Sequence, residues 1–250
     1  MLPPFSAVIP AFNEAVRIGD TLLATVAYLE KTSPGSEIIV INDGSTDETG
    51  NVVRKVFAQS FFRAVQLLEN FPNRGKGAAV HKGLLASTRP IGVFFDADLS
   101  TPIDELPKII DPVAKGEVDV AFGSRALNRR LIGRHQPWRR EQAGRVFNLI
   151  VRSATGLPFW DTQCGFKAFR MQSCRPIIES AKIDGFGFDV ELLFLAQRAG
   201  LQLREIPVRW NHHEGSKVRF VQDSLRMLRE IVALRSHVSA GDYDVVVSRA

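Results

Sequence analysis

The chain of 250 residues lacks any apolar run that approaches the roughly 18 residues needed to cross a bilayer. Its opening segment, residues 1–6, contains no basic residue, so we expect no signal peptide. The only two cysteines, Cys164 and Cys174, have neither metal-ligand spacing nor partner histidines, which favours an intracellular protein with free thiols. With 45% hydrophobic residues the chain can still bury a full core, and one domain is sufficient to account for it.

Two nucleotide-binding motifs are also absent. The sequence contains neither Gly-x-Gly-x-x-Gly nor the P-loop pattern, which argues against dinucleotide oxidoreductases and P-loop kinases. The first half instead alternates strand and helix patterns, and the strand patterns cover residues 5–9, 37–41, 64–68, 91–95 and 118–122. Repeated strand–helix units predict an α/β fold with a mostly parallel, doubly wound sheet flanked by helices.

The second half is less regular. Helix patterns cover residues 139–154, 189–199 and 218–235, a strand pattern covers 203–210, and a loop with a short strand covers 161–169. In the first half, Ser45 or Thr46 is the expected cap of the helix that follows the second strand.

Two carboxylates, Asp96 and Asp98, directly follow the apolar strand pattern at 91–95. In open α/β sheets, ligands bind just beyond the carboxyl ends of the strands. Two acids this close repel each other unless a cation lies between them. Because hard divalent cations take carboxylate and phosphate oxygens together, the pair suggests a metal that carries a diphosphate.

Charged residues follow the other strand patterns as well: Glu14, Asp43, Lys76 and Arg125. Together with the acid pair they describe a cleft lined for a nucleotide and its phosphates. Asp43 could accept a hydrogen bond from the N3–H of a pyrimidine base, and the Gly-Lys-Gly turn at 75–77 offers a cation and backbone N–H groups at a helix start.

A basic stretch begins at Arg125 and ends at Arg152, with eight arginines and a single acid, Glu141, on a chain of net charge +5. A patch of positive charge indicates an anionic partner. The stretch lacks the interleaved aromatics of a nucleic-acid stacking platform, so a phosphorylated substrate or an anionic membrane surface fits better. We expect Arg129, Arg130 and Arg134 to be surface charges.

These motifs carry a family resemblance. Residues 9–14, 42–47, 73–77 and 95–98 resemble the successive signatures of family-2 glycosyltransferases with the A-type nucleotide-diphospho-sugar fold. The blocks at 123–125, 161–167, 188–193 and 214–217 are similar to the branch of polyprenyl-phosphate glycosyltransferases that includes the dolichyl-phosphate β-glucosyltransferases. The resemblance covers roughly residues 5 to 220. It implies an inverting, metal-dependent transfer of a hexose, expected to be glucose, from a UDP-sugar to a polyprenyl phosphate.

The resemblance also assigns roles to matching positions. It implies that the nucleotide-sugar is bound by Pro10, Phe12, Glu14, Asp43, Lys76, Asp96 and Asp98. It implies Mg²⁺ or Mn²⁺ at Asp98 and Asp96, and an acceptor phosphate held by Arg125, Arg139, Arg140 and Lys217. Asp98, Arg125, Arg140, Asp161 and Gln163 are the catalytic candidates, with Asp161 and Gln163 beside the sugar. One departure stands out, because related mannosyltransferases have a metal-binding Gln where this chain has Ser100.

The chemistry of the acceptor leaves alternatives open. A phosphomonoester, with a second pKa of about 6, is already a dianion near neutral pH and needs no general base. A soluble hydroxyl acceptor would need one, and Asp161, Asp189 and Glu191 are the candidates. Asp189 opens a helix pattern, where it could equally be a cap, and Asp161 could simply anchor its loop. A sugar-phosphate nucleotidyltransferase or a non-catalytic nucleotide-sugar sensor is a more remote reading.

A polyprenyl acceptor would bring the chain to a membrane. In the pattern at 218–232, Val221, Leu225, Leu228 and Val232 share one helical face, which suits either an interfacial helix or a core-packed one. We expect a cytoplasmic protein held peripherally on the cytosolic membrane leaflet, with no nucleic-acid partner. We further expect a single catalytic domain over residues 1–250. Residues 1–125 would form its nucleotide-sugar half, 126–217 its acceptor half and 218–250 its C-terminal helix and tail.

Overall fold

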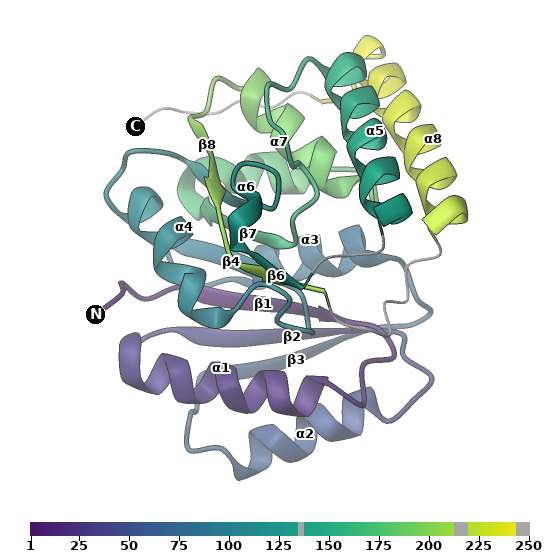
Figure 1. Ribbon diagram of the computed structural model, residues 1–250. Helices are drawn as coiled ribbons and strands as arrows, with labels where there is room; N and C mark the ends of the chain where they lie inside the picture. The colour runs from purple at the N-terminus through teal and green to yellow at the C-terminus, as the bar shows by residue number, and fades with distance from the viewer. Residues whose placement is uncertain (135–137, 213–219, 244–250) are drawn as a thin grey trace.

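The computed structural model describes residues 1–134, 138–212 and 220–243, without the side chains of 138–141, 143 and 220–223. Its centre is a seven-stranded sheet in the order β3-β2-β1-β4-β7-β5-β8, and a two-stranded sheet pairs β6 with β9 (Figure 1). The strands are β1 (Ser6–Ala11), β2 (Glu37–Asp43), β3 (Val65–Asn70), β4 (Ile91–Phe95), β5 (Val120–Ser124), β6 (Ile132–Arg134), β7 (Phe166–Arg170), β8 (Leu203–Pro207) and β9 (Trp210–Asn211). The predicted mostly parallel sheet flanked by helices is confirmed.

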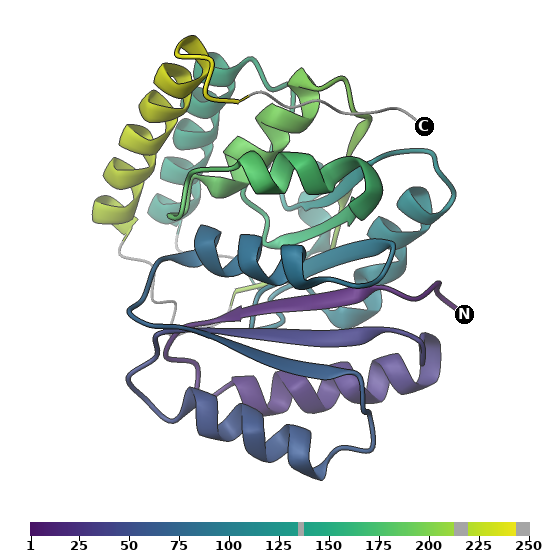
Figure 2. The same cartoon turned by 180° about the vertical axis from the view of Figure 1, so that it is seen from behind.

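Helices cover both faces of the sheet (Figures 1 and 2). They are α1 (Ile18–Thr32), α2 (Thr49–Gln59), α3 (Lys76–Ala86), α4 (Leu106–Ala114), α5 (Trp138–Thr155), α6 (Met171–Ser180), α7 (Phe188–Arg198) and α8 (Phe220–Ser239). Because successive strand residues point to opposite faces, each strand supplies two cores. Val8 and Ile41 pack in the core under α3, whereas Ile9 and Val40 pack in the core under α1.

Strand β7 is antiparallel to both of its neighbours, β4 and β5. Its first residue, Phe166, pairs with Phe95 at the carboxyl end of β4. The loop that leads into β7 therefore lies at the same edge of the sheet as the ends of the parallel strands. This insertion brings residues 161–165 beside Asp96, whose backbone N–H donates to the carbonyl of Gly165 at 3.2 Å.

Several local predictions need correction. Helix α2 begins at Thr49, and its first turn has no side-chain cap from Ser45 or Thr46. These two residues instead tie the second strand's loop to the first, because Asn13 donates from its backbone N–H to Ser45 and accepts from the Thr46 backbone N–H. Helix α6 and the β6–β9 pair were not predicted, and the single strand expected at 203–210 is divided into β8 and β9.

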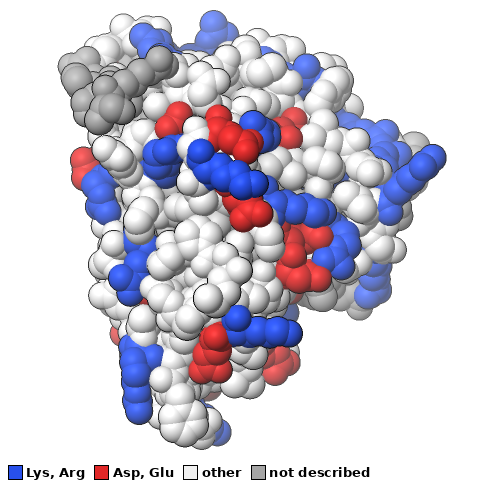
Figure 3. Space-filling model, turned by 90° about the vertical axis from the view of Figure 1, so that its left-hand side faces the viewer, with Lys and Arg blue, Asp and Glu red and all other residues white. Residues whose placement is uncertain are grey.

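The face at the amino ends of the parallel strands carries Lys, Arg, Asp and Glu side chains intermingled (Figure 3). Ion pairs at this edge include Arg204 with Glu117 and Arg170 with Asp119. In the described part of the chain, none of the helices combines the length and hydropathy of a membrane-crossing segment. The carboxyl ends of the parallel strands meet at the opposite edge of the sheet.

Candidate active site

Arg17, in the loop after β1, lies between the carboxylates of Glu14 and Asp98. Glu14 forms a bidentate pair with Arg17, whose Nε and Nη2 donate at 2.8 Å each. The remaining nitrogen of Arg17, Nη1, is buried and lies 4.0 Å from the carboxylate of Asp98. Arg17 was not singled out from the sequence, because its partner Asp98 follows a strand far along the chain. Pro10 lies at the end of β1 and the side chain of Phe12 is exposed beyond it.

Asp43, at the end of β2, is buried and organises the turn that opens α3. Its two carboxylate oxygens accept hydrogen bonds from Asn70 and Asn73 side chains, each at 2.8 Å. They also accept from the backbone N–H groups of Arg74 at 3.1 Å and Gly75 at 2.8 Å. A carboxylate has about four acceptor positions. These hydrogen bonds hold the carboxylate in place at the end of β2, and its contact with a pyrimidine stays a prediction.

Asp96 and Lys76 form an ion pair in which Nζ lies 2.5 Å from Oδ1. Burial opposes the charge on Lys76, but Asp96 and the nearby Asp189 outweigh it and raise the pKa of the lysine. The Asp96 carboxylate packs so closely on Gly165 that a Cβ atom at that position would overlap it. A glycine at 165 is therefore what lets the β7 loop approach the acid pair.

Asp98 is in a looser ion pair than Asp96, because it lies 4.0 Å from Arg17 whereas Asp96 lies 2.5 Å from Lys76. Its Oδ1 accepts from the backbone N–H of Ser100 at 2.9 Å, and a quarter of its side chain is exposed. Among the described residues, no cluster of three or more His, Cys, Asp or Glu side chains is arranged to hold a metal by itself. Mg²⁺ commonly binds to one or two protein carboxylates together with substrate phosphates. Asp98 with a diphosphate fits that pattern without a third protein ligand at Ser100.

Arg125 and Asp161 are brought together at the end of β5. The guanidinium donates from Nε at 2.7 Å and from Nη2 at 2.8 Å, and the Arg125 backbone N–H adds a third hydrogen bond at 2.9 Å. Burial would raise the pKa of Asp161, but Arg125 and its hydrogen bonds outweigh burial and lower it. The same pair, against the effect of burial, raises the pKa of Arg125. Both groups therefore stay charged and fixed to each other.

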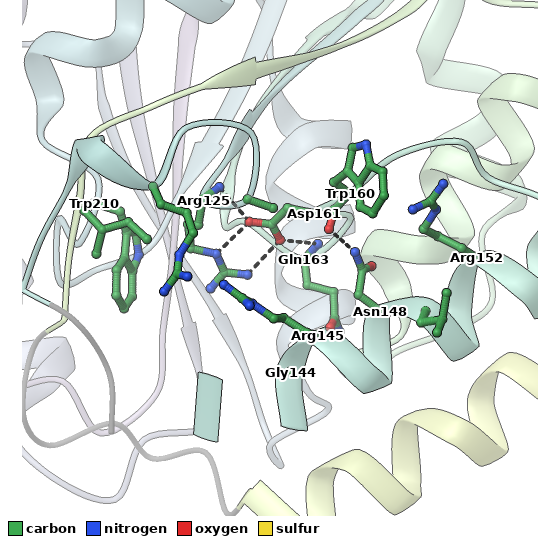
Figure 4. A pocket seen from close by; sticks show the side chains of 13 residues that line it. Arg125, Gly144, Arg145, Asn148, Arg152, Trp160, Asp161, Gln163 and Trp210 are labelled. Atoms are coloured by element: carbon green, nitrogen blue, oxygen red, sulfur yellow. Dashed lines mark hydrogen bonds and ion pairs between the residues drawn. The ribbon is translucent and has the colours of Figure 1, made fainter. Parts of the chain in front are cut away.

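A cavity of about 430 Å³ lies beside this pair (Figure 4). It is lined by four arginines and two tryptophans, together with polar and apolar side chains. Its lining consists of Arg125, Ala126, Arg129, Ile132, Gly144, Arg145, Asn148, Leu149, Arg152, Trp160, Asp161, Gln163 and Trp210. Arg129, expected as a surface charge, is exposed, and it also belongs to this lining. The tryptophans were not predicted, because they come from segments that reach the cavity only in the folded chain.

The tryptophans are paired with arginines in the cavity wall. The guanidinium carbon of Arg152 lies 3.9 Å from the ring centre of Trp160, and that of Arg125 lies 5.7 Å from Trp210. Arginine prefers such stacking on aromatic faces, which holds its charge toward a ligand. Glu205 of β8 fixes the same wall by accepting from the backbone N–H groups of Trp160 at 2.9 Å and Asp161 at 2.7 Å.

A second buried ion pair lies behind the cavity. Lys167 of β7 is fully buried and donates to Asp189 at 2.5 Å and to the carbonyl of Cys164 at 2.7 Å. Asp189, expected as either a cap or a catalytic acid, is therefore engaged with a lysine, and no side-chain cap is observed at the start of α7. Through the hydrogen bond from Lys167 to Cys164, this pair holds the 161–165 loop in place.

The structure gathers most of the sequence-predicted residues at one edge. Asp96, Lys76, Asp98, Arg125, Asp161 and Gln163 lie there together. Gln163 lines the cavity and contacts the sulfur of Met227 on α8 at 3.4 Å. The side chains of Arg139 and Arg140 and the whole of Lys217 lie outside the described residues.

Comparisons with known proteins give matches over most of the chain. Residues 6–178 match the family described as Glycosyl transferase family 2. The chain is 33% identical to the dolichyl-phosphate beta-glucosyltransferase of Saccharomyces cerevisiae, over 95% of this chain and 76% of that protein. It is 34% identical to the enzyme of the same name from Drosophila melanogaster, over 90% of this chain and 72% of that protein.

Solved structures show the same fold. Glucosyl-3-phosphoglycerate synthase from Mycobacterium tuberculosis, in complex with Mn²⁺, UDP-glucose and phosphoglyceric acid, superposes with a TM-score of 0.65. It is 20% identical to this chain and covers 95% of this chain and 80% of its own. At that identity the likeness establishes the fold alone.

Proposed function

The chain belongs to glycosyl transferase family 2, with the A-type fold, and on this premise we propose that it transfers glucose from UDP-glucose to a dolichyl-type polyprenyl phosphate. The observation that carries the proposal is the arginine-lined cavity beside the Arg125–Asp161 pair. A donor site rich in carboxylates and an acceptor site rich in arginines meet across the loop that contains Gly165. Residues 1–125 would form the donor half, residues 126–217 the acceptor half, and the segment from 218 the C-terminal helix and tail.

On the donor side, Asp98 and Asp96 would hold Mg²⁺ or Mn²⁺ on the diphosphate. The metal, when bound, would neutralise the charge that develops on the departing UDP. The loops after β1 and β2 would hold the uridine, with Pro10, Phe12, Glu14 and Asp43 as the proposed contacts. Lys76 would keep Asp96 oriented and add a positive charge at the start of α3, near the phosphates.

On the acceptor side, Arg125 would bind the phosphate through the guanidinium edge that Asp161 leaves open, with Arg139, Arg140 and Lys217 as further proposed contacts. An acceptor phosphate oxygen attacks the anomeric carbon of glucose, and a new C–O bond forms there. The bond from that carbon to the UDP oxygen breaks, and UDP leaves with the electron pair. The configuration at the carbon inverts through an oxocarbenium-like transition state. Gln163 would lie beside the sugar.

A dianionic phosphate acceptor needs no general base, and the carboxylates that could act as one are bound to other residues of the protein. Asp161 is held as a carboxylate by Arg125, and Asp189 is paired with Lys167. Glu191 accepts from the backbone N–H groups of Lys182 at 2.8 Å and Ile183 at 2.9 Å. All three candidate bases for a hydroxyl acceptor thus have partners within the protein. This favours the phosphate acceptor over the soluble hydroxyl acceptor.

A polyprenyl acceptor resides in a bilayer, so we also propose that the chain acts at the cytosolic leaflet as a peripheral protein. Sedimentation with vesicles of phosphatidylcholine and phosphatidylglycerol tests this association. Salt-sensitive binding is expected, and a chain that stays in the supernatant at low salt would contradict it.

The function is tested by UDP release from a panel of UDP-sugars with Mg²⁺ or Mn²⁺, with and without a short-chain polyprenyl phosphate. Release from UDP-glucose that depends on the lipid phosphate is expected. Release that is unaffected by the lipid would mean hydrolysis or another acceptor. A preference for another UDP-sugar would correct the donor while leaving the acceptor intact.

A further inference from the structure

Helix α5 presents apolar side chains to solvent. Val146 and Leu149 are 60% and 61% exposed, and Ile150 is exposed as well. Their spacing puts all three on one face of the helix. The opposite face of α5 is already used, because Phe147 and Val151 are buried in the core. The outward apolar face is therefore not needed to hold α5 on the protein.

Helix α8 lies beside α5 and repeats this arrangement (Figures 1 and 2). Its inner face buries Met227, Ile231 and Leu234 in the core. On another face, Leu225 and Val232 are exposed, two helical turns apart. Of the predicted apolar face of this helix, Leu225 and Val232 are thus exposed, Leu228 is half-buried against the core, and the side chain of Val221 lies outside the described residues. Together, Val146, Leu149, Ile150, Leu225 and Val232 form what we call the outer apolar face.

Arginines accompany this face. Arg145 and Arg152 lie on α5, and exposed Arg226 and Arg229 lie on α8. The single acid in the sequence of α5 is Glu141, whose side chain lies outside the described residues. On α8 the carboxylate of Glu230 accepts the backbone N–H of Gly187 at 2.8 Å and also lies 3.4 Å from Nε of Arg226, which leaves Arg229 as the second exposed arginine of this helix. Apolar side chains with flanking arginines complement a bilayer that contains anionic lipid.

The cavity opens next to this face. Leu149 both lines the cavity and belongs to the outer apolar face. Trp160, the residue that stacks on Arg152, also lines the cavity while more than half of it is exposed. A chain that entered the cavity past these two side chains would have apolar contacts outside and arginines inside (Figure 4).

We propose that the outer apolar face of α5 and α8 rests on an anionic bilayer, and that Leu149 and Trp160 contact the first isoprenoid units of the acceptor as they enter the cavity. This inference rests on the proposed function and specifies the surface through which it operates. A second copy of the chain is a poorer occupant, since a two-fold interface opposes each surface patch to itself. The arginines on both helices would then be brought against arginines.

The test introduces charge into this face outside the cavity. Val146→Glu and Leu225→Glu are compared with Leu23→Glu, because Leu23 on α1 is 59% exposed, close to the 60% of Val146 and the 54% of Leu225. Transfer is measured with a long-chain polyprenyl phosphate in vesicles that contain phosphatidylglycerol, and with a short, water-soluble isoprenoid phosphate. We expect kcat/KM with vesicles to fall at least tenfold in both test variants and less than twofold in Leu23→Glu. With the soluble acceptor, all three variants should stay within twofold of the parent chain.

These outcomes separate the inference from the function. Equal vesicle activity in the test variants and the parent chain overturns the inference while leaving the function in place. No transfer to either acceptor by the parent chain overturns the function itself. A dimer of the parent chain in solution that Val146→Glu converts to a monomer would identify the face as an interface between copies and also overturn the inference.

A second measurement does not depend on activity. Cys164 and Cys174 are buried, and burial raises the pKa of each thiol to about 12, so an introduced surface cysteine reacts with a label first. An environment-sensitive dye on Val146→Cys or Leu225→Cys should shift to the blue when anionic vesicles are added. The same dye on Leu23→Cys should not shift. Equal shifts at all three positions, or none at Val146, would contradict the proposed orientation.

Discussion

Arg125 and Asp161, from loops on either side of α5, bind each other through a bidentate pair and a backbone hydrogen bond. The pair fixes one edge of the guanidinium inside the protein. The rest of the arginine, with its charge intact, lines the cavity and stacks near Trp210. Asp161 is accordingly a positioning residue for an anion-binding arginine, and this assignment sets the first prediction.

Asp161→Asn should raise the KM for the lipid phosphate at least tenfold and leave the KM for the UDP-sugar within twofold. The amide retains the shape of the carboxylate but loses the charge that orients Arg125. Because Arg125 lowers the pKa of Asp161, its carboxylate is ionised above its ordinary value of 3.8. The contribution of the pair is therefore present above that value and is lost as pH falls through the lower folded value. Steady-state kinetics between pH 5 and 8 should show no titration of this acid.

A general base would behave differently in the same experiment. Asp161→Asn would then lower kcat by orders of magnitude while the acceptor KM changed little. That outcome, or an acid limb near neutral pH that the variant abolishes, would restore the hydroxyl-acceptor mechanism.

Asp98→Ala should abolish turnover, since it removes the carboxylate proposed to hold the metal on the diphosphate. We expect its Mn²⁺-dependent affinity for UDP, measured by calorimetry, to fall at least tenfold. UDP binding without metal should change little. Near-normal rates at saturating Mn²⁺ would refute the assignment. Asp104→Ala is the control, because Asp104 is an exposed acid that pairs with Arg209 away from the acid pair.

Lys167→Met should lower the free energy of unfolding by about 3–5 kcal/mol, because it leaves the carboxylate of Asp189 buried without its lysine. Asp189→Leu should cost a similar amount. The double variant should recover much of that loss, since two apolar side chains replace the whole pair and no unpaired charge stays buried. Urea unfolding of the four proteins measures the coupling. Losses that simply add would show that the two side chains do not depend on each other.

The stability of the protein should fall as pH drops from about 6.5 to about 4, partly through His81. Burial, the largest cause, lowers the pKa of this histidine to about 4. In this window the unfolded chain binds a proton that the folded chain excludes, so folding is disfavoured by up to about 3 kcal/mol. His81→Leu should flatten the pH dependence of the unfolding free energy in this window. An unchanged slope in the variant would exclude His81 as its source.

The sequence predicted the strand ends well, because a parallel strand is apolar throughout and its polar continuation is easily seen. The acid pair at Asp96 and Asp98 lies where the pattern at 91–95 indicated. Spacing along the chain, however, does not say which strands become neighbours. The antiparallel β7 lies between β4 and β5, and only this insertion brings Gly165 against Asp96.

Ion pairs between residues far apart in the sequence could not be predicted either. Asp189 and Lys167 are 22 residues apart and come from a helix and a strand, so the helix start alone suggested a cap. Arg129 is exposed, as expected of a surface charge, but its segment alone did not indicate that it lines the cavity. Helix α6 contains Pro176, which interrupts the helix pattern in the sequence although the residue is accommodated within the folded helix.

In the proposed reaction, glucose passes from UDP-glucose to a polyprenyl phosphate, and a competition assay between two acceptors measures this transfer. Glucose-labelled UDP-glucose is incubated with Mn²⁺ and equal concentrations of a polyprenyl phosphate and 3-phosphoglyceric acid, and the label is then partitioned between organic and aqueous phases. We expect the label in the organic phase, in a lipid product from which mild acid releases glucose. Label found only in glucosyl-phosphoglycerate or in free glucose would contradict it.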